Sequence, residues 1–571
     1  MTISTPSRVR SEAKHWAKSL SGNLGSVADS CLRLSTEIEA IMQSAGAFSS
    51  QHNSQKIAVL SGHGLNALHL STDALWTMAL RHRGHNALGV ICDRGIPACE
   101  FNFRGDGRRS PPEQRVAFTG PANAHICSVC TGSARRVIGA TRAPVFTLRQ
   151  FGQDADEQAA FRISAAVPAG DIRQFEYRGV PVGDHAFSST LRSTLRGEVA
   201  YDDPDEMWIY RRELASSIML VDRLNRLIDQ EKPDKFVGIH GVYLMHGTMA
   251  DVCRTRGIPA VIYGMPYRKG TIWFSHRETY HHSLVKEPVS FWNTTALDTA
   301  KRQEIDVYMR SREVGGRDNV NYHPNPILDR ENVVRAIGLD PARPIVSMFT
   351  NVIWDAQIVY PSNAFENIFD WIYWTIEYFR TRSDLQLVIR IHPAETKGGF
   401  VTRQPMYPEI MARYPNLPPN IFVLPSESDV GSYTLAEMSR ACLIYGTKMG
   451  VEIAYRGIPV IVAGESFNRG KGFTYDVSTK DEYRALLDKI QDLPRNSDTM
   501  TEAARRYAYY FFYQKMMDID LLTPGLARST RVAGESFYTF TDVDALDPGR
   551  SRTLDVICNG ILEGSPLFTP L

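Results

Sequence analysis

The chain has 571 residues, of which 43% are hydrophobic and 22% charged, a composition typical of globular proteins that excludes wholesale disorder and collagen-like repeats. Its 64 basic and 63 acidic residues leave a net charge of +1, so no global field attracts a polyanion, and a nucleic-acid partner is disfavoured. The length exceeds that of one ordinary core and predicts two large domains with additions.

Residues 1–50 carry apolar residues at helical spacing and are predicted to form a helical N-terminal extension. This segment lacks the apolar stretch of a signal peptide, and no apolar run in the chain approaches the ~18 residues of a membrane span. The sequence therefore predicts a cytoplasmic protein, either free or at the inner face of the membrane.

The next region, residues 51–330, alternates β-rich apolar runs with helical stretches. Its strand-like runs lie at residues 56–62, 85–93, 235–240 and 258–264, a rhythm typical of a parallel sheet. We expect a first Rossmann-like domain here, although residues 100–230 give no clear pattern.

Residues 331–490 repeat this rhythm more clearly, with short apolar strands separated by helices of ten or more residues. They predict a second Rossmann-like domain. The expected fold class is therefore α/β, with two Rossmann-like domains, the helical N-terminal extension and C-terminal helices.

The tail, residues 491–571, is expected to be helical. Tyr507, Tyr510 and Phe511 lie at helical spacing, either as a membrane-contacting face or as buried rings. Because basic residues are sparse beside them, we favour a tail that packs across the two domains and buries these rings.

The most informative segment is the apolar strand that ends at Arg390, Ile391 and His392, before Pro393 and Glu395. Ligands in open α/β sheets bind beyond the carboxyl ends of the strands, which is where His392 falls. Its imidazole can donate a hydrogen bond to a phosphate oxygen and so stabilise a departing nucleotide, and Arg390 can add positive charge. Glu395, in the polar cluster that follows, is also expected to contact the donor. The alternative is a histidine that only satisfies a loop carbonyl.

A second strand ends at Gly446, Thr447 and Lys448, and a helix begins directly after them. Such a turn presents backbone N–H groups and the positive end of the helix dipole to an anion, and Gly450 lies in the first helical turn. Glu452 falls on the same helix, either facing a ribose or lying on the surface to complement the dipole.

Other strand ends supply further candidates. Asp355 follows the first strand of the second domain and is either a sugar ligand or a helix cap, while the neighbouring Trp354 is expected to be a buried indole. His63 and Asp93 follow the first two strands of the first domain. Each is a candidate for the base that takes a proton from a hydroxyl group, and each is equally a loop cap.

Four cysteines, Cys92, Cys99, Cys127 and Cys130, form a C-x6-C pair followed by a C-x2-C pair. The second spacing suits one zinc ion, whereas the first is wider than a usual knuckle. The pattern leaves a structural zinc and a set of buried thiols as the two interpretations.

Two motifs together, RIHPAE at residues 390–395 and YGTKMGVEIAYRGIPVIVAG at residues 445–464, resemble the bacterial capsule polysaccharide biosynthesis glycosyltransferases, including the Kdo transferases. They resemble the GT-B sialyltransferases more distantly. The resemblance covers residues 344–463 well and the first domain only in general plan. It implies a GT-B fold with a donor domain at 331–490 and an acceptor domain at 51–330, His392 and Thr447 at the donor phosphate, and Glu452 near the ribose.

The function that this resemblance implies is transfer of a sugar from a nucleotide-activated donor to a glycan or glycolipid acceptor in surface polysaccharide synthesis. Consecutive serines of the sialyltransferase-like members are replaced here by Gly446-Thr447-Lys448, which leaves CMP, UDP and GDP donors open. No D-x-D signature lies at a suitable strand end, so we expect catalysis without a metal or other cofactor. The alternatives are a nucleotide-sugar epimerase or hydrolase and an inactive scaffold in a polysaccharide assembly complex.

Overall fold

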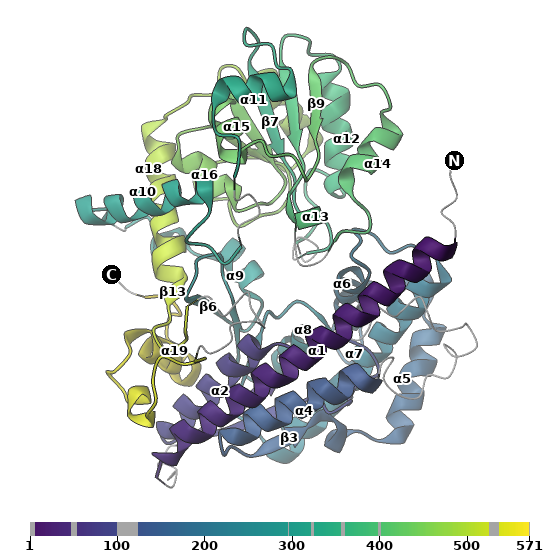
Figure 1. The fold of residues 1–571 in the computed structure, drawn as a ribbon, viewed down its shortest axis with the longest axis vertical. Helices are drawn as coiled ribbons and strands as arrows, with labels where there is room; N and C mark the ends of the chain where they lie inside the picture. The colour runs from purple at the N-terminus through teal and green to yellow at the C-terminus, as the bar shows by residue number, and fades with distance from the viewer. Residues whose placement is uncertain are drawn as a thin grey trace. The chain divides into compact units, whose positions relative to one another are not determined.

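The computed structural model describes residues 6–46, 54–99, 124–294, 296–320, 325–355, 360–397, 401–524 and 536–569. The chain divides into two compact units. Unit 1 contains residues up to Thr194, Val199–Tyr280 and Met517–Thr569, and unit 2 contains Leu195–Glu198 and His281–Met516. Each unit is built around its own sheet (Figure 1).

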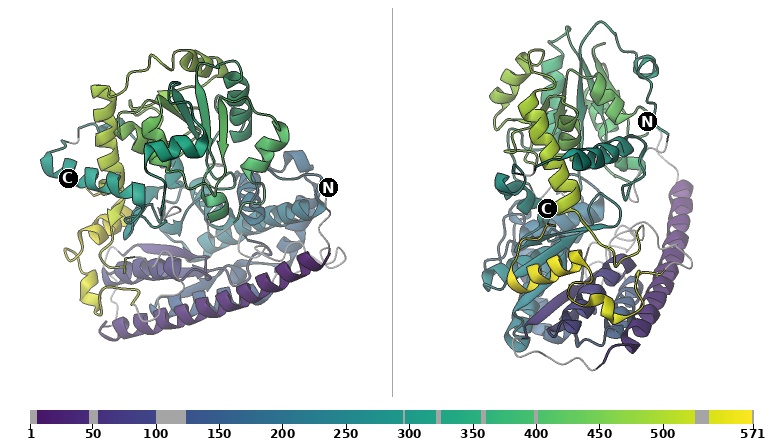
Figure 2. Two further views of the ribbon diagram at one scale, coloured as in Figure 1. Left: turned by 45° about the horizontal axis from the view of Figure 1, so that its top comes forward. Right: turned by 90° about the vertical axis from the view of Figure 1, so that its left-hand side faces the viewer.

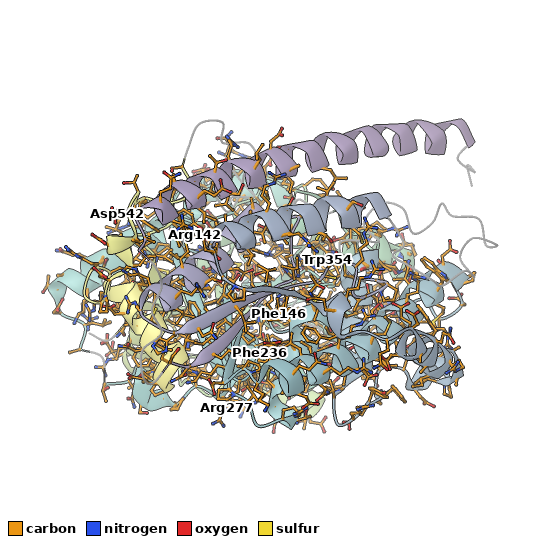
Figure 3. The ribbon with its side chains drawn as sticks, turned by 90° about the horizontal axis from the view of Figure 1, so that it is seen from below. Arg142, Phe146, Phe236, Arg277, Trp354 and Asp542 are labelled. Atoms are coloured by element: carbon orange, nitrogen blue, oxygen red, sulfur yellow. The ribbon has the colours of Figure 1, made fainter. Side chains whose placement is uncertain are left out.

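The sheet of unit 1 has the strand order β13-β6-β5-β4-β1-β2-β3. Strands β1 to β5 pair in parallel, and β6 pairs antiparallel with both β5 and β13. Figure 3 shows this sheet from below, with Phe146 of β3 and Phe236 of β4 labelled. The strands are β1 (Lys56–Ser61), β2 (Asn86–Ile91), β3 (Val145–Thr147), β4 (Lys235–Ile239), β5 (Ala260–Gly264), β6 (Thr271–His276) and β13 (Met517–Asp518).

Helices cover the sheet of unit 1, and the long helix α1 packs on α4 (Figure 2). Leu34 and Ile38 of α1 are fully buried in the core, so α1 is part of unit 1. The helices are α1 (Pro6–Gln43), α2 (Ala67–His82), α4 (Ala124–Ala140), η1 (Leu148–Phe151), α5 (Asp154–Ala166), η2 (Ala169–Asp171), α6 (Val182–Thr194), α7 (Pro204–Glu231), α8 (Leu244–Thr255), η7 (Val543–Leu546) and α19 (Arg552–Glu563).

The sheet of unit 2 has the order β12-β11-β10-β7-β8-β9, and all its pairings are parallel. Every residue of β7, β8, β10 and β11 is buried, as expected for strands covered by helices on both faces. The strands are β7 (Ile345–Phe349), β8 (Gln386–Arg390), β9 (Ile421–Leu424), β10 (Ala441–Ile444), β11 (Val460–Val462) and β12 (Tyr475–Asp476).

The helices of unit 2 connect these strands and extend to residue 515. They are α9 (Tyr280–Lys286, which begins on the last residue of unit 1), η3 (Val289–Phe291), α10 (Thr299–Val314), α11 (Arg330–Ile337), α12 (Ile368–Phe379), α13 (Ala394–Lys397), α14 (Met406–Arg413), α15 (Ser432–Met438), α16 (Met449–Tyr455), α17 (Lys480–Asp488), α18 (Asp498–Tyr509) and the π-helical turn η5 (Tyr510–Lys515).

Two helix-flanked sheets rich in parallel strands confirm the predicted fold class. The chain passes from unit 1 to unit 2 between residues 280 and 281, and it returns to unit 1 between residues 516 and 517. These positions differ from the expected boundaries near 330 and 490, because α10 and α18 pack within unit 2 while β13 pairs with β6 of unit 1.

The aromatic residues of the tail lie inside unit 2. Tyr507, Tyr510 and Phe511 are fully buried, and Phe511 stacks on Phe467 with ring centroids 5.2 Å apart. The expected burial of these rings is confirmed. Within the described ranges, no helix combines the length and apolar character needed to cross a membrane.

Candidate active site

The carboxyl end of β7 is the point in unit 2 where the strand order reverses. β8 and β9 lie on one side of β7, and β10, β11 and β12 lie on the other. Open α/β sheets bind ligands in the crevice that forms at such a switch point. The loops after β8 and β10 therefore occupy the expected ligand-binding edge, and they are the two loops singled out by the sequence.

Two residues that follow β7 fix both loops. Thr350 Oγ1 accepts a hydrogen bond from the backbone N–H of His392 at 3.0 Å. Asn351 Oδ1 accepts one from the backbone N–H of Gly446 at 3.4 Å. The loops that carry His392 and Gly446 are thus held by adjacent side chains at one strand end, a connection that the sequence pattern did not reveal.

His392 is half-buried, and one of its ring nitrogens is engaged locally. Its Nδ1 accepts a hydrogen bond from the backbone N–H of Ala394 at 3.1 Å. An imidazole nitrogen that accepts carries no proton, so the neutral ring has its proton on Nε2. His392 is therefore a hydrogen-bond donor through Nε2, which is the form suited to a phosphate oxygen.

The turn at Gly446, Thr447 and Lys448 leads into α16. Thr447 closes this turn, because its Oγ1 accepts from the N–H of Met449 at 3.4 Å and its carbonyl accepts from the N–H of Gly450 at 3.1 Å. Thr447 therefore closes the turn before α16, while Lys448 occupies the N-cap position without a side-chain cap hydrogen bond.

Gly450 is required by packing. A Cβ added at this position would lie 2.7 Å from both Cγ of Asn468 and Cδ1 of Ile444. Asn468 is fully buried and donates through Nδ2 to the carbonyl of Thr447 at 2.9 Å. Gly450 therefore lets Asn468 approach and support the turn, and the structure gives it this role in place of the expected donor contact.

Glu452 has a different role from the predicted ribose contact. Its side chain is fully buried and its carboxylate faces three donors: Arg312 Nε at 2.6 Å, Lys448 Nζ at 3.0 Å and the Tyr433 hydroxyl at 2.8 Å. Burial opposes the charge of Arg312, but Glu452 together with Tyr433 and Tyr308 outweighs it, so that the pKa of Arg312 is raised well above its usual value. Glu452 is committed to this network and positions Lys448 at the start of α16.

Arg390 is also a positioning residue. It is 2% exposed and donates to the carbonyls of Ile391 at 3.2 Å, Pro425 at 2.6 Å and Ser428 at 2.8 Å. Burial lowers the pKa of Arg390 to about 10. The guanidinium therefore secures the loop after β9, and the expected charge on the donor phosphate is not supplied by this residue.

Glu395 secures the start of α14. It is 1% exposed, and its carboxylate accepts from the backbone N–H of Met406 at 3.2 Å. Burial raises the pKa of Glu395 to about 7. We therefore assign Glu395 to helix capping, in place of the predicted contact with the donor.

Trp354 and Asp355 follow β7. The indole of Trp354, labelled in Figure 3, is 6% exposed and donates from Nε1 to Thr402 Oγ1 at 2.9 Å. The expected buried indole is confirmed. Asp355 is half-buried at the same strand end, where its predicted contact with a sugar stays a prediction.

In unit 1, histidines from separate segments gather at the carboxyl edge of the sheet. His63 follows β1, His69 lies in the first turn of α2, and His246 lies in α8. The His63 ring centroid is 5.4 Å from that of His69 and 4.6 Å from that of His246. The sequence analysis singled out His63 but missed His69, which is marked only by the capping residue Asn66 three positions earlier.

Burial keeps two of these rings uncharged. It lowers the pKa of His69 to about 3 and that of His246 to about 4. The Nε2 of His246 lies 3.1 Å from the carbonyl of Leu60, which can only accept, so this nitrogen carries the proton. Neither ring offers a strong base near neutral pH.

A chain of hydrogen bonds sets the tautomer of His63. Asn66 uses its Oδ1 to cap α2, which places its NH2 group 3.2 Å from His69 Nε2. His69 therefore accepts at Nε2 and carries its proton on Nδ1, which lies 3.2 Å from His63 Nδ1. His63 accepts at Nδ1 and is protonated at Nε2, so it is a donor. This corrects the expectation of His63 as a base.

Asp93 lies in the turn after β2, with a backbone φ of +46°. Its carboxylate forms an ion pair with Arg135 of α4 at 2.9 Å. Asp93 is thus held at the carboxyl end of the strand and stays a candidate base.

The four cysteines Cys92, Cys99, Cys127 and Cys130 are free thiols. Burial raises the pKa of all four, to about 11 for Cys127 and about 12 for Cys130, although zinc binds the thiolate. Within the described part of the chain, a set of three ligand atoms within 4.8 Å of one another is formed by His82, Asp544 and Asp547 and by no three cysteines. The structural zinc stays a prediction.

No protein-family model matches this chain, and no curated protein matches it in sequence. Solved structures with a similar arrangement include the β-Kdo 2,4-transferase KpsC of Thermosulfurimonas dismutans, at 12% identity and a TM-score of 0.31, covering 48% of this chain and 79% of that chain. The UDP-GlcNAc 2-epimerase of Neisseria meningitidis, at 9% identity and a TM-score of 0.25, covers 80% of this chain and 98% of that chain. The calicheamicin glycosyltransferase CalG4, at 12% identity and a TM-score of 0.24, covers 80% and 95%. At these values we draw no argument about activity from the likenesses.

Proposed function

We propose that this protein is a GT-B glycosyltransferase that transfers a sugar from a nucleotide-activated donor to a hydroxyl of a glycan or glycolipid acceptor in bacterial surface polysaccharide synthesis. The observation that carries this proposal is the edge of unit 2 where Thr350 and Asn351 hold His392 and Gly446 beside one strand end. This edge offers a fixed Nε2–H donor suited to a phosphate, and Lys448 adds a positive charge at the turn before α16.

In the proposed reaction, the bond between the sugar carbon and the phosphate oxygen breaks while the acceptor oxygen bonds to that carbon. Negative charge then grows on the departing phosphate. His392 donates a hydrogen bond to it, and Lys448, held by Glu452, adds positive charge at the same turn. Preorganised donors of this kind stabilise a leaving group without a metal ion.

The acceptor hydroxyl loses its proton in the same step, and we assign the base to Asp93. His63 carries its proton on Nε2 and is assigned to a hydrogen bond that orients a substrate oxygen. The proposed setting is the cytoplasm, with the enzyme at the inner face of the membrane when the acceptor is a glycolipid.

The test is thermal unfolding of the wild type and His392→Ala in the presence of CMP, UDP or GDP. A ligand that binds only the folded state at 100 times its Kd stabilises it by about 2.7 kcal/mol. We expect one nucleotide to raise the Tm of the wild type and to raise that of His392→Ala much less. His85→Ala is the matched control. His85 directly precedes β2 and therefore lies at the amino ends of the parallel strands of unit 1, whereas ligands bind at the carboxyl ends.

Product analysis with the matching nucleotide sugar then separates the activities. A glycosylated acceptor supports the proposal, whereas a free or epimerised sugar formed without any acceptor favours the epimerase or hydrolase alternative. If none of the three nucleotides raises the Tm and no turnover is detected, the result favours the inactive scaffold.

A further inference from the structure

Unit 2 carries an open groove of about 700 Å³ along α12, and none of its lining residues belongs to the loops that hold His392 and Gly446. Its volume falls within the range of about 300–1,000 Å³ that is usual for ligand sites. Figure 1 shows α12 next to α14 in this unit. The groove is lined by Glu198, Glu366, Asn367, Phe369, Asp370, Tyr373, Trp374, Glu377, Tyr378, Thr381, Arg382, Arg413, Tyr414, Arg484 and Asp488.

The groove exists because α12 is apolar on two faces. One face carries Trp371, Ile372 and Ile376, which are completely buried. The face toward the groove carries Tyr373 and Trp374, which are half-buried. A helix on the surface of a globular protein normally has a polar outer face, so aromatic rings in this position point to a function beyond the core.

The aromatic rings of the groove are packed against one another and therefore rigid. Trp374 stacks on Tyr378 with centroids 5.9 Å apart and ring planes 9° from parallel. Tyr373 stacks on Phe369 at 5.9 Å. Rigid aromatic side chains contribute contact area at little cost in conformational entropy.

Guanidinium groups lie close to two of these rings. The Arg413 Cζ lies 4.4 Å from the centroid of the Tyr373 ring, and the Arg484 Cζ lies 5.2 Å from that of Trp374. Both arginines are exposed side chains. Each can donate several hydrogen bonds toward the groove without leaving its ring.

The charges of the lining select against a polyanion. Its ionisable groups are five carboxyl groups and three guanidinium groups, so the formal balance is −2. Nucleic acids and anionic lipid headgroups are therefore disfavoured. An apolar peptide segment would remove the carboxylates and guanidiniums from water without replacing their hydrogen bonds, at a net cost.

We propose that this groove binds an uncharged oligosaccharide. Sugar rings present C–H faces to aromatic side chains and hydroxyl groups to carboxylates and guanidiniums, which are the two kinds of group that the groove combines. The lining positions of α12 run from Phe369 to Tyr378, about 14 Å at 1.5 Å per residue, so an elongated ligand fits. That this ligand is the growing acceptor glycan rests on the proposed function; binding of the sugar does not.

The experiment titrates purified full-length protein with neutral oligosaccharides of five to seven hexoses in α-1,4, β-1,4 and β-1,3 linkage, by calorimetry. We expect binding of at least one of them and at least a tenfold weaker Kd in Trp374→Ala and in Tyr373→Ala. The matched control is Tyr407→Ala, an exposed tyrosine of α14 that does not line the groove and that should bind like the wild type. Circular dichroism confirms that each variant is folded.

His392→Ala provides the separation from the donor site, and we expect it to bind the oligosaccharide with the wild-type Kd. If the wild type binds no nucleotide or shows no turnover, the proposed function is overturned, but the groove proposal stands. The groove proposal is overturned if none of the oligosaccharides binds, or if Trp374→Ala and Tyr373→Ala bind like the wild type. Binding of heparin in preference to the neutral sugars would also overturn it.

Discussion

Replacing Glu452 with Gln tests whether this residue belongs to the buried network or to a ribose. The substitution keeps the shape of the side chain and one oxygen for Tyr433, but it removes the charge that faces Arg312 and Lys448. Hydrogen bonds to a charged partner contribute about 1.5–3 kcal/mol and neutral ones about 1 kcal/mol, so two contacts lose about 2–3 kcal/mol together. Arg312 keeps its ion pair with Asp318. The free energy of unfolding should therefore fall by less than it would if a buried charge were left unpaired.

The assay for Glu452→Gln is urea unfolding, combined with measurement of nucleotide affinity. At a slope of about 2–3 kcal/mol per molar urea, the unfolding midpoint of unit 2 should fall by about 1 M, with a smaller effect on affinity. Glu377→Gln is the control, because its exposed ion pair with Arg380 contributes only about 0–1 kcal/mol. The reasoning is refuted if Glu452→Gln unfolds like the wild type while its nucleotide affinity is lost.

Three further predictions concern Glu395, His63 and Gly450. Burial raises the pKa of Glu395 from 4.5 to about 7, so its contribution to stability is present below pH 4.5 and lost as the pH rises through 7. Glu395→Gln should therefore match the wild type in thermal unfolding at pH 5 and gain up to about 3 kcal/mol relative to it at pH 8; a constant difference across this range would contradict the assignment. His63→Gln, whose amide nitrogen can replace Nε2, should retain more activity than His63→Asn, and ¹⁵N spectra of the wild type should show His63 protonated at Nε2; protonation at Nδ1 would refute the donor role. Gly450→Ala should cost about 1–3 kcal/mol in urea unfolding, because the added Cβ meets Asn468 at 2.7 Å, and an unchanged midpoint would show that Asn468 moves without cost.

The sequence was sufficient to locate the strands around the proposed donor site. The runs that form β8 and β10 are short and apolar and end abruptly in polar residues, so the positions of His392 and Gly446 at a strand end followed directly. The placement of β7 between β8 and β10 depends on contacts between distant segments, so local sequence patterns did not predict it. For the same reason they did not predict the roles of Thr350 and Asn351, which no local pattern marks.

The roles of the charged residues were harder to predict, because they depend on partners distant in sequence. Glu452 meets Arg312, which lies 140 positions earlier in α10, and Arg390 meets carbonyls of the loop after β9. Spacing along a helix or strand gives the direction of a side chain but not the groups that it faces. His63 was misassigned for the same reason, since its tautomer depends on a chain of bonds that begins at Asn66.

The division of the chain places unit 2 as an insertion within unit 1. Residues 517–569 return to unit 1, where they add β13 to the sheet and place Leu546, Ile557 and Ile561 in its core. During synthesis, unit 2 can therefore fold as soon as its main segment, residues 281–516, has emerged, whereas unit 1 completes its core only when the last helix, α19, is available. Loss of the segment after residue 516 should accordingly unfold the unit whose first strand begins at residue 56, even though unit 2 retains residues 195–198 and 281–516.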